Sequence, residues 1–350
     1  MEKFGFLSFG NYGPGRGSKV IDAHASLHQA IDLSVRADEL GVNGAYFRVH
    51  HFARQQSAPM TLLAAIAART KHIEVGTGVI DLRYENPLYL AEEAASLDII
   101  ADQRIALGMS RGSPETVTRG YESFGYTGSK DPRGADIARE KFDQFIAAID
   151  GEGIAAGDPR MTGSDRPQPI RPLSPGLKSR IWWGSATRDS AEWAGRQGVN
   201  LMSSTLLTED AGIPFADLQA EQIDRFRAAW DEAGHPGKPR VSVSRSVFPL
   251  INDLDRAYFG STDSDQVGVI DGYRSTFGKT YAAEPDVLIE QLRADAAVMS
   301  ADTLMLTIPV ALGVDFNAHI LESFATHVAP ALGWNPAGLQ SPVGAASVSA

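Results

Sequence analysis

Short apolar segments alternate with amphipathic segments along almost the whole chain, and this alternation restricts the possible folds more than any other feature of the sequence. Several of the apolar runs lack the strict apolar and polar alternation of a half-exposed strand. Runs of this kind are typical of strands that are buried on both faces of a parallel sheet. The eight predicted strands lie at residues 3–9, 42–51, 73–80, 104–112, 180–186, 200–206, 240–250 and 303–310.

Eight strands that are each followed by a helical stretch predict a (β/α)8 TIM barrel of the α/β class. An open doubly wound sheet is the alternative, and it would place a G-x-G-x-x-G fingerprint after the first strand. The glycine-rich segment FGNYGPGRG at 9–17 does not lead directly into a helix, so the barrel is favoured. We expect one domain over residues 1–335 and a flexible C-terminal tail over 336–350.

Two helices have recognisable starts. Asn86 followed by Pro87 predicts an N-cap and a first helical position. A later helix opens with Glu-Pro-Asp, which places acids near the positive end of the helix dipole. Apolar residues at helical spacing mark the buried side of this later helix: Leu288, Leu292, Ala296 and Met299.

Two connections are too long for a minimal barrel, one after the fourth helix at 151–179 and one after the seventh strand at 251–283. Long loops in compact domains are usually functional or disordered. The second connection contains several aromatic residues, namely Tyr258, Phe259, Tyr273, Phe277 and Tyr281. Because it follows a strand at the end of the barrel where active sites lie, we interpret it as a lid.

The composition excludes several classes of function. The formal net charge is −11, which argues against a surface for nucleic acid or for an anionic membrane. The absence of cysteine excludes disulfides, thiolate nucleophiles and cysteine-ligated metals. We expect no membrane partner and a cytoplasmic location, because the chain lacks an apolar run of about 18 residues and a signal-peptide pattern at its start.

A pair of histidines, His50 and His51, ends the second predicted strand and raises the question of a metal site. Adjacent residues on a strand point to opposite faces, so only one imidazole would enter the barrel. The other six histidines are scattered, and no H-E-x-x-H motif is present. We therefore predict no metal site.

A possible anion site follows the fifth predicted strand, where Gly184 and Ser185 lead into a helix with Ser190 in its first turn. Small residues permit close approach to the backbone, and the helix N-terminus favours a phosphate. Arg111, at the end of the fourth strand, could reach the same phosphate. The alternative is that Ser185 and Thr187 are ordinary helix caps and that Arg111 pairs with a carboxylate.

Four blocks of the sequence, taken in order from Phe4 to about Trp334, resemble the bacterial luciferase-like flavin-dependent monooxygenases. None of the blocks is specific alone, but their order and spacing together are fairly specific for the family. The blocks are HHFARQQSAPMTLLAAIAART, IEVGTGVIDLRYENPLYLAEEAASLDIIADQRIALGMSRG, WGSATRDSAEWAGRQGV and GVDFNAHILESFATHVAPALGW.

The resemblance implies a TIM barrel that binds FMN or, in one branch of the family, a deazaflavin. Residues that match the family's phosphate site are Arg111, Gly112, Gly184, Ser185, Ala186, Thr187 and Ser190. Gly78 and Val79 match a non-prolyl cis peptide that lies against the isoalloxazine ring, and His51 matches a histidine near its reactive edge. Many relatives carry an acid where this chain has Val49, and Arg48 is unusual.

The resemblance also implies the reaction and the partners. Reduced FMN, supplied by a separate NAD(P)H:flavin reductase, would react with O2 through a C4a-peroxyflavin to oxygenate a small organic substrate, with His51 in acid/base catalysis. A homodimer is expected. Two alternatives remain open: a deazaflavin-dependent hydride-transfer oxidoreductase on the same barrel, and a non-catalytic flavin-binding subunit.

Overall fold

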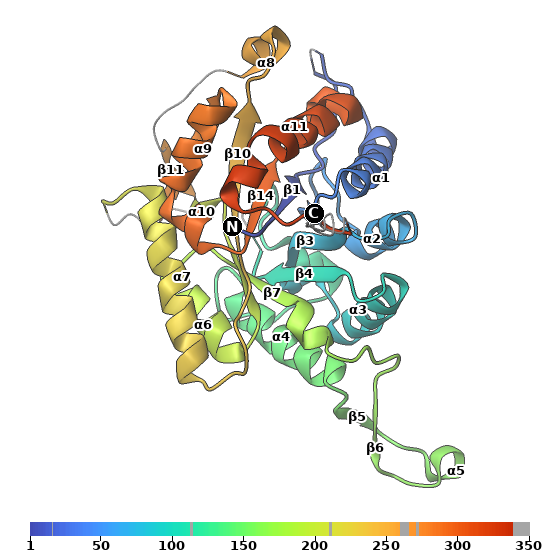
Figure 1. The fold of residues 1–350 in the computed structure, drawn as a ribbon. Coiled ribbons are helices and arrows are strands. Elements are labelled where there is room, and N and C mark those ends of the chain that lie inside the picture. The colour runs from blue at the N-terminus through green and yellow to red at the C-terminus, as the bar shows by residue number, and fades with distance from the viewer. Residues whose placement is uncertain (16, 113–114, 210–211, 260–265, 271–272, 339–350) are drawn as a thin grey trace, which may run out of the picture.

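In a computed structural model of the protein, eight parallel strands form a closed barrel, which confirms the predicted fold (Figure 1). Around the barrel the strands run in the order β10, β14, β1, β2, β3, β4, β7 and β8, and β8 pairs again with β10. Their bounds are Lys3–Ser8 (β1), Gly44–Phe47 (β2), Glu74–Asp81 (β3), Ile105–Ser110 (β4), Ile181–Ser185 (β7), Asn200–Ser203 (β8), Val241–Pro249 (β10) and Thr303–Thr307 (β14).

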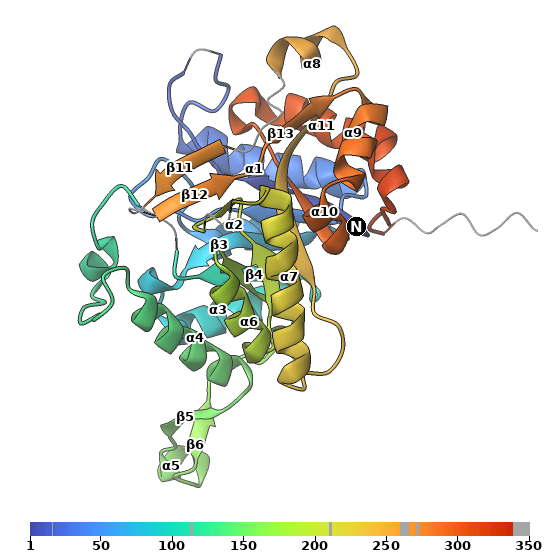
Figure 2. The same cartoon turned by 90° about the vertical axis from the view of Figure 1, so that its left-hand side faces the viewer.

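A helix follows each barrel strand and covers the outside of the barrel (Figures 1 and 2). These helices are Ala23–Glu39 (α1), Pro59–Ala67 (α2), Pro87–Ile100 (α3), Ala135–Ile149 (α4), Arg188–Gln197 (α6), Phe215–Glu232 (α7), Pro285–Arg293 (α9) and Gly313–His327 (α11). No described helix is both long and apolar enough to span a bilayer.

The structure describes residues 1–338 apart from 16, 113–114, 210–211, 260–265 and 271–272, and it describes no side chain between 260 and 277. Most of the predicted tail, from 339 onward, is therefore outside the described residues. The start of the tail lies against the barrel, where the Ala337 N–H donates to the Gly41 carbonyl (2.8 Å).

The inside of the barrel holds a layer of mainly apolar side chains, and polar side chains lie below this layer, at the amino ends of the strands. The layer consists of Leu7, Tyr46, Ala106, Trp182, Met202 and Met305. Below it, Arg240 pairs with Glu74 (2.7 Å) and lies over the Trp182 ring (4.6 Å), and Tyr46 donates to Glu74 (2.7 Å). These polar contacts occupy the amino ends of the strands, and active sites of this fold lie at the carboxyl ends.

The predicted start of α3 is confirmed, because the Asn86 side chain accepts from the Leu88 and Tyr89 N–H groups and Pro87 is the first helical residue. The prediction of one continuous late helix through Leu288 and Met299 is wrong. The helix ends at Arg293, and a second helix, Ala296–Ser300 (α10), begins after Asp295. Asp295 caps α10 and pairs with the buried Arg245 (2.8 Å). Its side chain therefore holds the break between α9 and α10, where the apolar spacing predicted one continuous helix.

The two long connections both contain regular structure. Residues 151–179 include an exposed arm that projects from the barrel (Figures 1 and 2), built from Gly153–Ala156 (β5), Pro159–Thr162 (α5) and Pro167–Pro169 (β6). Residues 251–283 contain Asp253–Tyr258 (α8), Gln266–Ile270 (β11), Tyr273–Phe277 (β12) and Thr280–Ala283 (β13).

Pairing within the second connection links it to the barrel rim. Strand β12 pairs with β11 and with Leu206–Leu207 (β9), which follows β8, and β13 extends the sheet beside β10. The lid itself stays a prediction, because the side chains of Tyr273 and Phe277 are not among those described.

Candidate flavin site at the carboxyl end of the barrel

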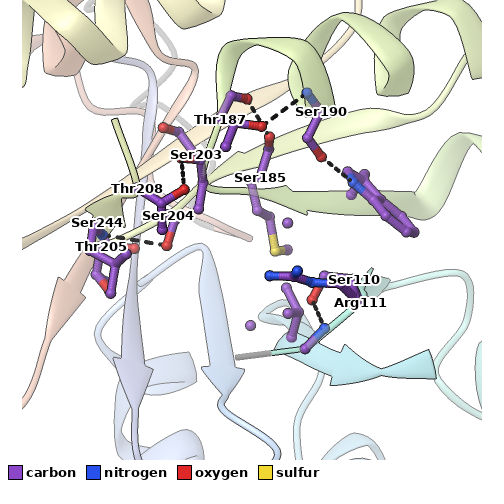
Figure 3. Close-up of a pocket in the computed structure, with 18 of the residues that line it drawn as sticks. Ser110, Arg111, Ser185, Thr187, Ser190, Ser203, Ser204, Thr205, Thr208 and Ser244 are labelled. Atoms are coloured by element: carbon purple, nitrogen blue, oxygen red, sulfur yellow. Dashed lines mark hydrogen bonds between the residues drawn. The ribbon is translucent and has the colours of Figure 1, made fainter. Parts of the chain in front are cut away.

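A cavity of about 530 Å³ opens above the interior layer, at the carboxyl ends of the barrel strands. Its size is within the usual range for small-molecule sites. Leu7, Met202 and Met305 of the interior layer form its apolar floor together with Val79. Its walls come from the residues that follow β1, β2, β4, β7 and β8 and from α4 (Figure 3).

The cavity brings together every residue that the sequence predicted for cofactor binding. Its lining includes Gly78, Val79, Arg111, Gly112, Gly184, Ser185, Ala186, Thr187 and Ser190. These residues come from three different strand ends, and Figure 3 shows Arg111 facing the segment that carries Ser185, Thr187 and Ser190. Their roles in binding stay predictions.

The turn after β7 is held rigidly at the start of α6. Thr187 is the N-cap, and its hydroxyl accepts from the Ser190 N–H (3.2 Å), while the Ser185 hydroxyl donates to the Thr187 carbonyl (2.8 Å). Gln222 of α7 donates to the same carbonyl (3.0 Å). The capping role considered for Ser185 and Thr187 is therefore present. It is compatible with an anion site, because it fixes the α6 N-terminus at the cavity wall.

Trp183 supports the same corner of the site. Its indole N–H donates to the Ser190 hydroxyl (3.0 Å), and its ring packs against Phe142 and Trp193 with centroids 5.2 Å and 4.5 Å away. Since the Ser190 hydroxyl oxygen accepts from Trp183, its own hydrogen is directed to another acceptor. A bound phosphate oxygen would be such an acceptor.

Arg111 and Gly112 occupy a tight bend after β4. Gly112 has φ +87°, and an added Cβ would overlap the Asp81 carboxylate. Asp81 in turn forms an ion pair with Arg83 (2.5 Å). Burial raises the pKa of Asp81, while the positive charges of Arg83 and Arg111 act in the opposite direction. The bend thus places the Arg111 guanidinium at the cavity wall beside a buried carboxylate.

The peptide bond between Gly78 and Val79 is cis, as predicted. It coincides with an irregularity in β3, where the pairing with β4 shifts register between Thr77 and Ile80. The bulge turns the Val79 side chain toward the cavity floor, where it lies over Gly108 and Gly184.

His51 does not line the cavity, although its neighbours Arg48 and Val49 do. Its ring stacks on Tyr84 with centroids 4.1 Å apart, and its Nε2 atom is buried without a hydrogen-bond partner. Burial and the charge of Arg83 lower the pKa of His51. A catalytic role for His51 therefore remains a prediction, and it would require the imidazole to leave the Tyr84 stack.

His50 is buried, and burial together with the positive charge of Arg48 lowers its pKa to about 4. The imidazole pair is thus biased toward the neutral state at pH 7. No group of three or more potential ligands gathers at a metal-binding spacing within the described part of the chain.

Sequence reasoning missed two arginines and one acid of the cavity lining, namely Arg133, Arg139 and Glu209, and it noted Arg48 only as an unusual residue beside the histidine pair. Arg48 had a detectable signal, because it lies two residues after Tyr46 and so points to the same face of the strand. Arg133 and Arg139 had none, since they belong to α4 and the segment before it, after a long connection without a periodic pattern. Glu209 pairs with Arg188 at the start of α6 (3.0 Å).

The chain is similar in sequence to known monooxygenases. It is 29% identical over 237 residues to the oxygenase component of the flavin-dependent trigonelline monooxygenase of Acinetobacter baylyi, a match that covers 65% of this chain and 60% of that protein. The matched region therefore spans less than two thirds of that relative's length. The chain is also 24% identical over 310 residues to limonene 1,2-monooxygenase of Rhodococcus erythropolis, which covers 83% of this chain and 78% of that protein.

Solved structures share the fold. Monooxygenase RslO1 of Streptomyces bottropensis has a TM-score of 0.70 at 21% identity, over 94% of this chain and 99% of that one. The oxygenating constituent of 3,6-diketocamphane monooxygenase of Pseudomonas putida, solved in complex with FMN, has a TM-score of 0.66 at 19% identity with the same coverage. An F420-dependent secondary alcohol dehydrogenase is also similar, with a TM-score of 0.59 at 15% identity, over 95% of this chain and 99% of that one.

The model of one protein family, the luciferase-like monooxygenases, matches residues 1–255 and therefore most of the chain. The match includes β1 to β4, β7 and β8 and thus all the cavity residues predicted from the sequence. The chain belongs to the luciferase-like monooxygenase family.

Proposed function

We propose that the protein binds FMN in the cavity and oxygenates a small organic substrate with O2. The observation that carries this proposal is that Arg111 faces the α6 N-terminus across one cavity whose floor contains Val79. A guanidinium, serine and threonine hydroxyls and a helix N-terminus form a donor set suited to a phosphate group. The apolar floor suits a flat aromatic ring.

Different residues along the cavity would bind the phosphate, support the ring and exclude water. Arg111 and the turn from Gly184 to Ser190 would hold the phosphate, and the Gln222 bond to Thr187 would keep that turn in position. Val79 would support the ring from below, and Leu7, Met202 and Met305 would exclude water from its underside. When bound and reduced, the flavin supplies the chemistry that activates O2.

His51 is our candidate for proton transfer. Its lowered pKa favours a neutral imidazole, which can accept a proton at Nε2 or donate one from the other nitrogen according to tautomer. The Nε2 atom is buried without a hydrogen-bond partner while the ring is stacked on Tyr84, so an imidazole that leaves this stack for the cavity would bring to a bound ligand an atom whose hydrogen bond is not yet made. The pKa direction and the unpartnered Nε2 atom support this assignment.

We also propose that a separate NAD(P)H:flavin reductase supplies reduced FMN. The designation of the Acinetobacter baylyi relative as an oxygenase component supports a two-component arrangement. The expected homodimer and the cytoplasmic location stay predictions.

The test is to titrate the apoprotein with FMN, riboflavin and the deazaflavin cofactor, and then to mix the protein with reduced flavin and O2. We expect the tightest binding for FMN, and substrate-dependent O2 consumption that incorporates one oxygen atom into product. Tighter binding of the deazaflavin with hydride transfer would favour the alternative oxidoreductase. Flavin binding without turnover on any substrate would favour the non-catalytic subunit.

A further inference from the structure

Glu209 lines the cavity beside the start of α6, the place that the proposed function gives to the flavin phosphate. The segment that carries Glu209 runs along the turn after β7 (Figure 3). The Ser204 N–H donates to the Ser185 carbonyl (2.9 Å). The Thr208 N–H donates to the Ala186 carbonyl (3.0 Å). These backbone bonds hold the chain where the Glu209 side chain reaches the first residue of α6.

The Glu209 carboxylate already makes the contacts that an anion makes at a helix N-terminus. Its Oε2 atom accepts from the backbone N–H of Arg188, the first residue of α6 (3.4 Å), and from the Nε–H of the same residue (3.0 Å). The Ser190 N–H of the same turn donates to the Thr187 hydroxyl (3.2 Å). Two N–H groups of the first turn are therefore in use, one of them by a negatively charged side chain.

A phosphate and the Glu209 carboxylate would oppose each other at this end of α6. The N-terminus of a helix stabilises negative charge, but the effect falls off within the first turn. A phosphate monoester carries about 1.5 to 2 negative charges at pH 7, and two anions in one site repel each other. A phosphate bound here would therefore have to push the carboxylate aside or bear its repulsion.

The ion pairs around Arg188 allow the carboxylate to leave. The Arg188 NH1 group also donates to both carboxylate oxygens of Glu221 in α7 (2.9 Å each). Glu221 pairs in turn with Arg225 (2.7 Å). Arg188 thus keeps a carboxylate partner when Glu209 turns away, and its guanidinium is not left buried without compensation.

We propose that the Glu209 carboxylate competes with the flavin phosphate for the start of α6 and thereby lowers the affinity for FMN. This inference rests on the proposed function, because it assigns a further residue that regulates the same phosphate site. A lowered affinity suits a flavin that arrives reduced from a separate reductase and leaves after oxidation. Glu209 therefore acts on how long the flavin stays bound and not on the chemistry of the flavin ring.

The test compares the wild-type protein with the variants E209Q, E209A and E221Q. E209Q removes the charge but keeps an oxygen acceptor at the same distance from the backbone, and E209A removes the acceptor as well. E221Q is the matched control, because it removes the other carboxylate that contacts Arg188 and Glu221 does not line the cavity. The apoprotein of each is titrated with FMN, riboflavin and inorganic phosphate by calorimetry.

We expect E209Q and E209A to bind FMN about 3- to 30-fold more tightly than the wild type, the range for one charge near a helix end. Inorganic phosphate should gain a similar factor, because it carries the same charged group. Riboflavin affinity should stay unchanged, which also shows that the cavity of each variant is intact. E221Q should bind all three probes as the wild type does.

The proposal is overturned if E209Q and E209A bind FMN no more tightly than the wild type, or if riboflavin or the E221Q control shows the same gain. Weaker FMN binding in E209Q would overturn it too, because Glu209 would then hold Arg188 in place for the phosphate. Failure of the proposed function has a different signature. Wild type and variants would bind no FMN, while the phosphate titrations would still decide whether E209Q strengthens anion binding at α6.

Discussion

Gly184 makes room for Val79, because a Cβ built on Gly184 would lie 2.9 Å from Val79 Cγ1 and 3.2 Å from Cγ2. The two residues come from the bulge in β3 and the end of β7, two strands that have β4 between them. The small residue at 184 therefore determines how the floor of the cavity is shaped and not only how closely a phosphate approaches the turn.

Replacing Gly184 by alanine should push Val79 out of its position. We expect G184A to lower the free energy of unfolding by about 1–3 kcal/mol, as for an overpacked core, and to weaken flavin binding. The double variant V79A/G184A removes both clashing methyl groups and should recover most of the loss. Chemical denaturation and flavin titration of the wild type, both single variants and the double variant measure the coupling. Additive effects would show that the two side chains act independently.

Gly112 is needed for two separate reasons, its positive φ and the Asp81 carboxylate beside it. Gly125 has a similar φ of +90° but no atom within 4 Å of an added Cβ, so it isolates the conformational effect. We expect G125A to cost about 1 kcal/mol of unfolding free energy and G112A to cost clearly more, because its methyl group must displace Asp81 from Arg83. Equal losses in thermal or urea unfolding would contradict a role for the Asp81 contact.

Protonation of His50 should destabilise the folded protein in mild acid. Its pKa is lowered to about 4 in the folded state, against about 6.5 when unfolded. The unfolded chain thus binds more protons between these values, so stability falls as the pH drops from about 6.5 to about 4. The loss should be at most about 3.4 kcal/mol, because the two pKa values differ by about 2.5 and each pKa unit corresponds to about 1.36 kcal/mol. H50Q should show a shallower pH dependence in urea unfolding, and an unchanged slope would exclude His50 as the source.

His51 is predicted to act in turnover and not in flavin binding. H51Q keeps a polar side chain of similar size but cannot titrate, so we expect flavin affinity to stay unchanged and kcat to fall by about 100-fold or more. The control is H24Q, because His24 is exposed on α1. Rapid-mixing kinetics with reduced flavin measure both steps. Normal turnover in H51Q would leave the imidazole with a packing role against Tyr84.

The barrel was predictable because each strand and helix carries its own local signal. Asn86 and Pro87 define a helix start through capping chemistry alone, and the strand runs are apolar enough to be recognised without their partners. The gathering of the candidate residues in one cavity was predictable for a related reason, since parallel strands bring their carboxyl ends together once the fold is known. The cofactor role expected for Gly78 and Val79 came from the resemblance to the family.

The remaining features depend on contacts between distant residues. His51 faces Tyr84 because of packing after β3, and Arg139 reaches the cavity from α4, where its ring neighbour is Trp193. The break before α10 depends on the ion pair between Asp295 and Arg245, which are far apart in the sequence. A short stretch of sequence does not indicate which distant residues it will contact in the folded protein.

The central claim is that the flavin phosphate lies between Arg111 and the N-terminus of α6, and the most direct measurement is the affinity for FMN compared with riboflavin. We predict that the wild-type protein prefers FMN and that R111Q loses about 10- to 100-fold of FMN affinity while riboflavin affinity is unchanged. R139Q, which removes another cavity arginine, should keep most of the preference. Equal losses for FMN and riboflavin in R111Q, or a loss of the FMN preference in R139Q instead, would contradict this placement of the phosphate.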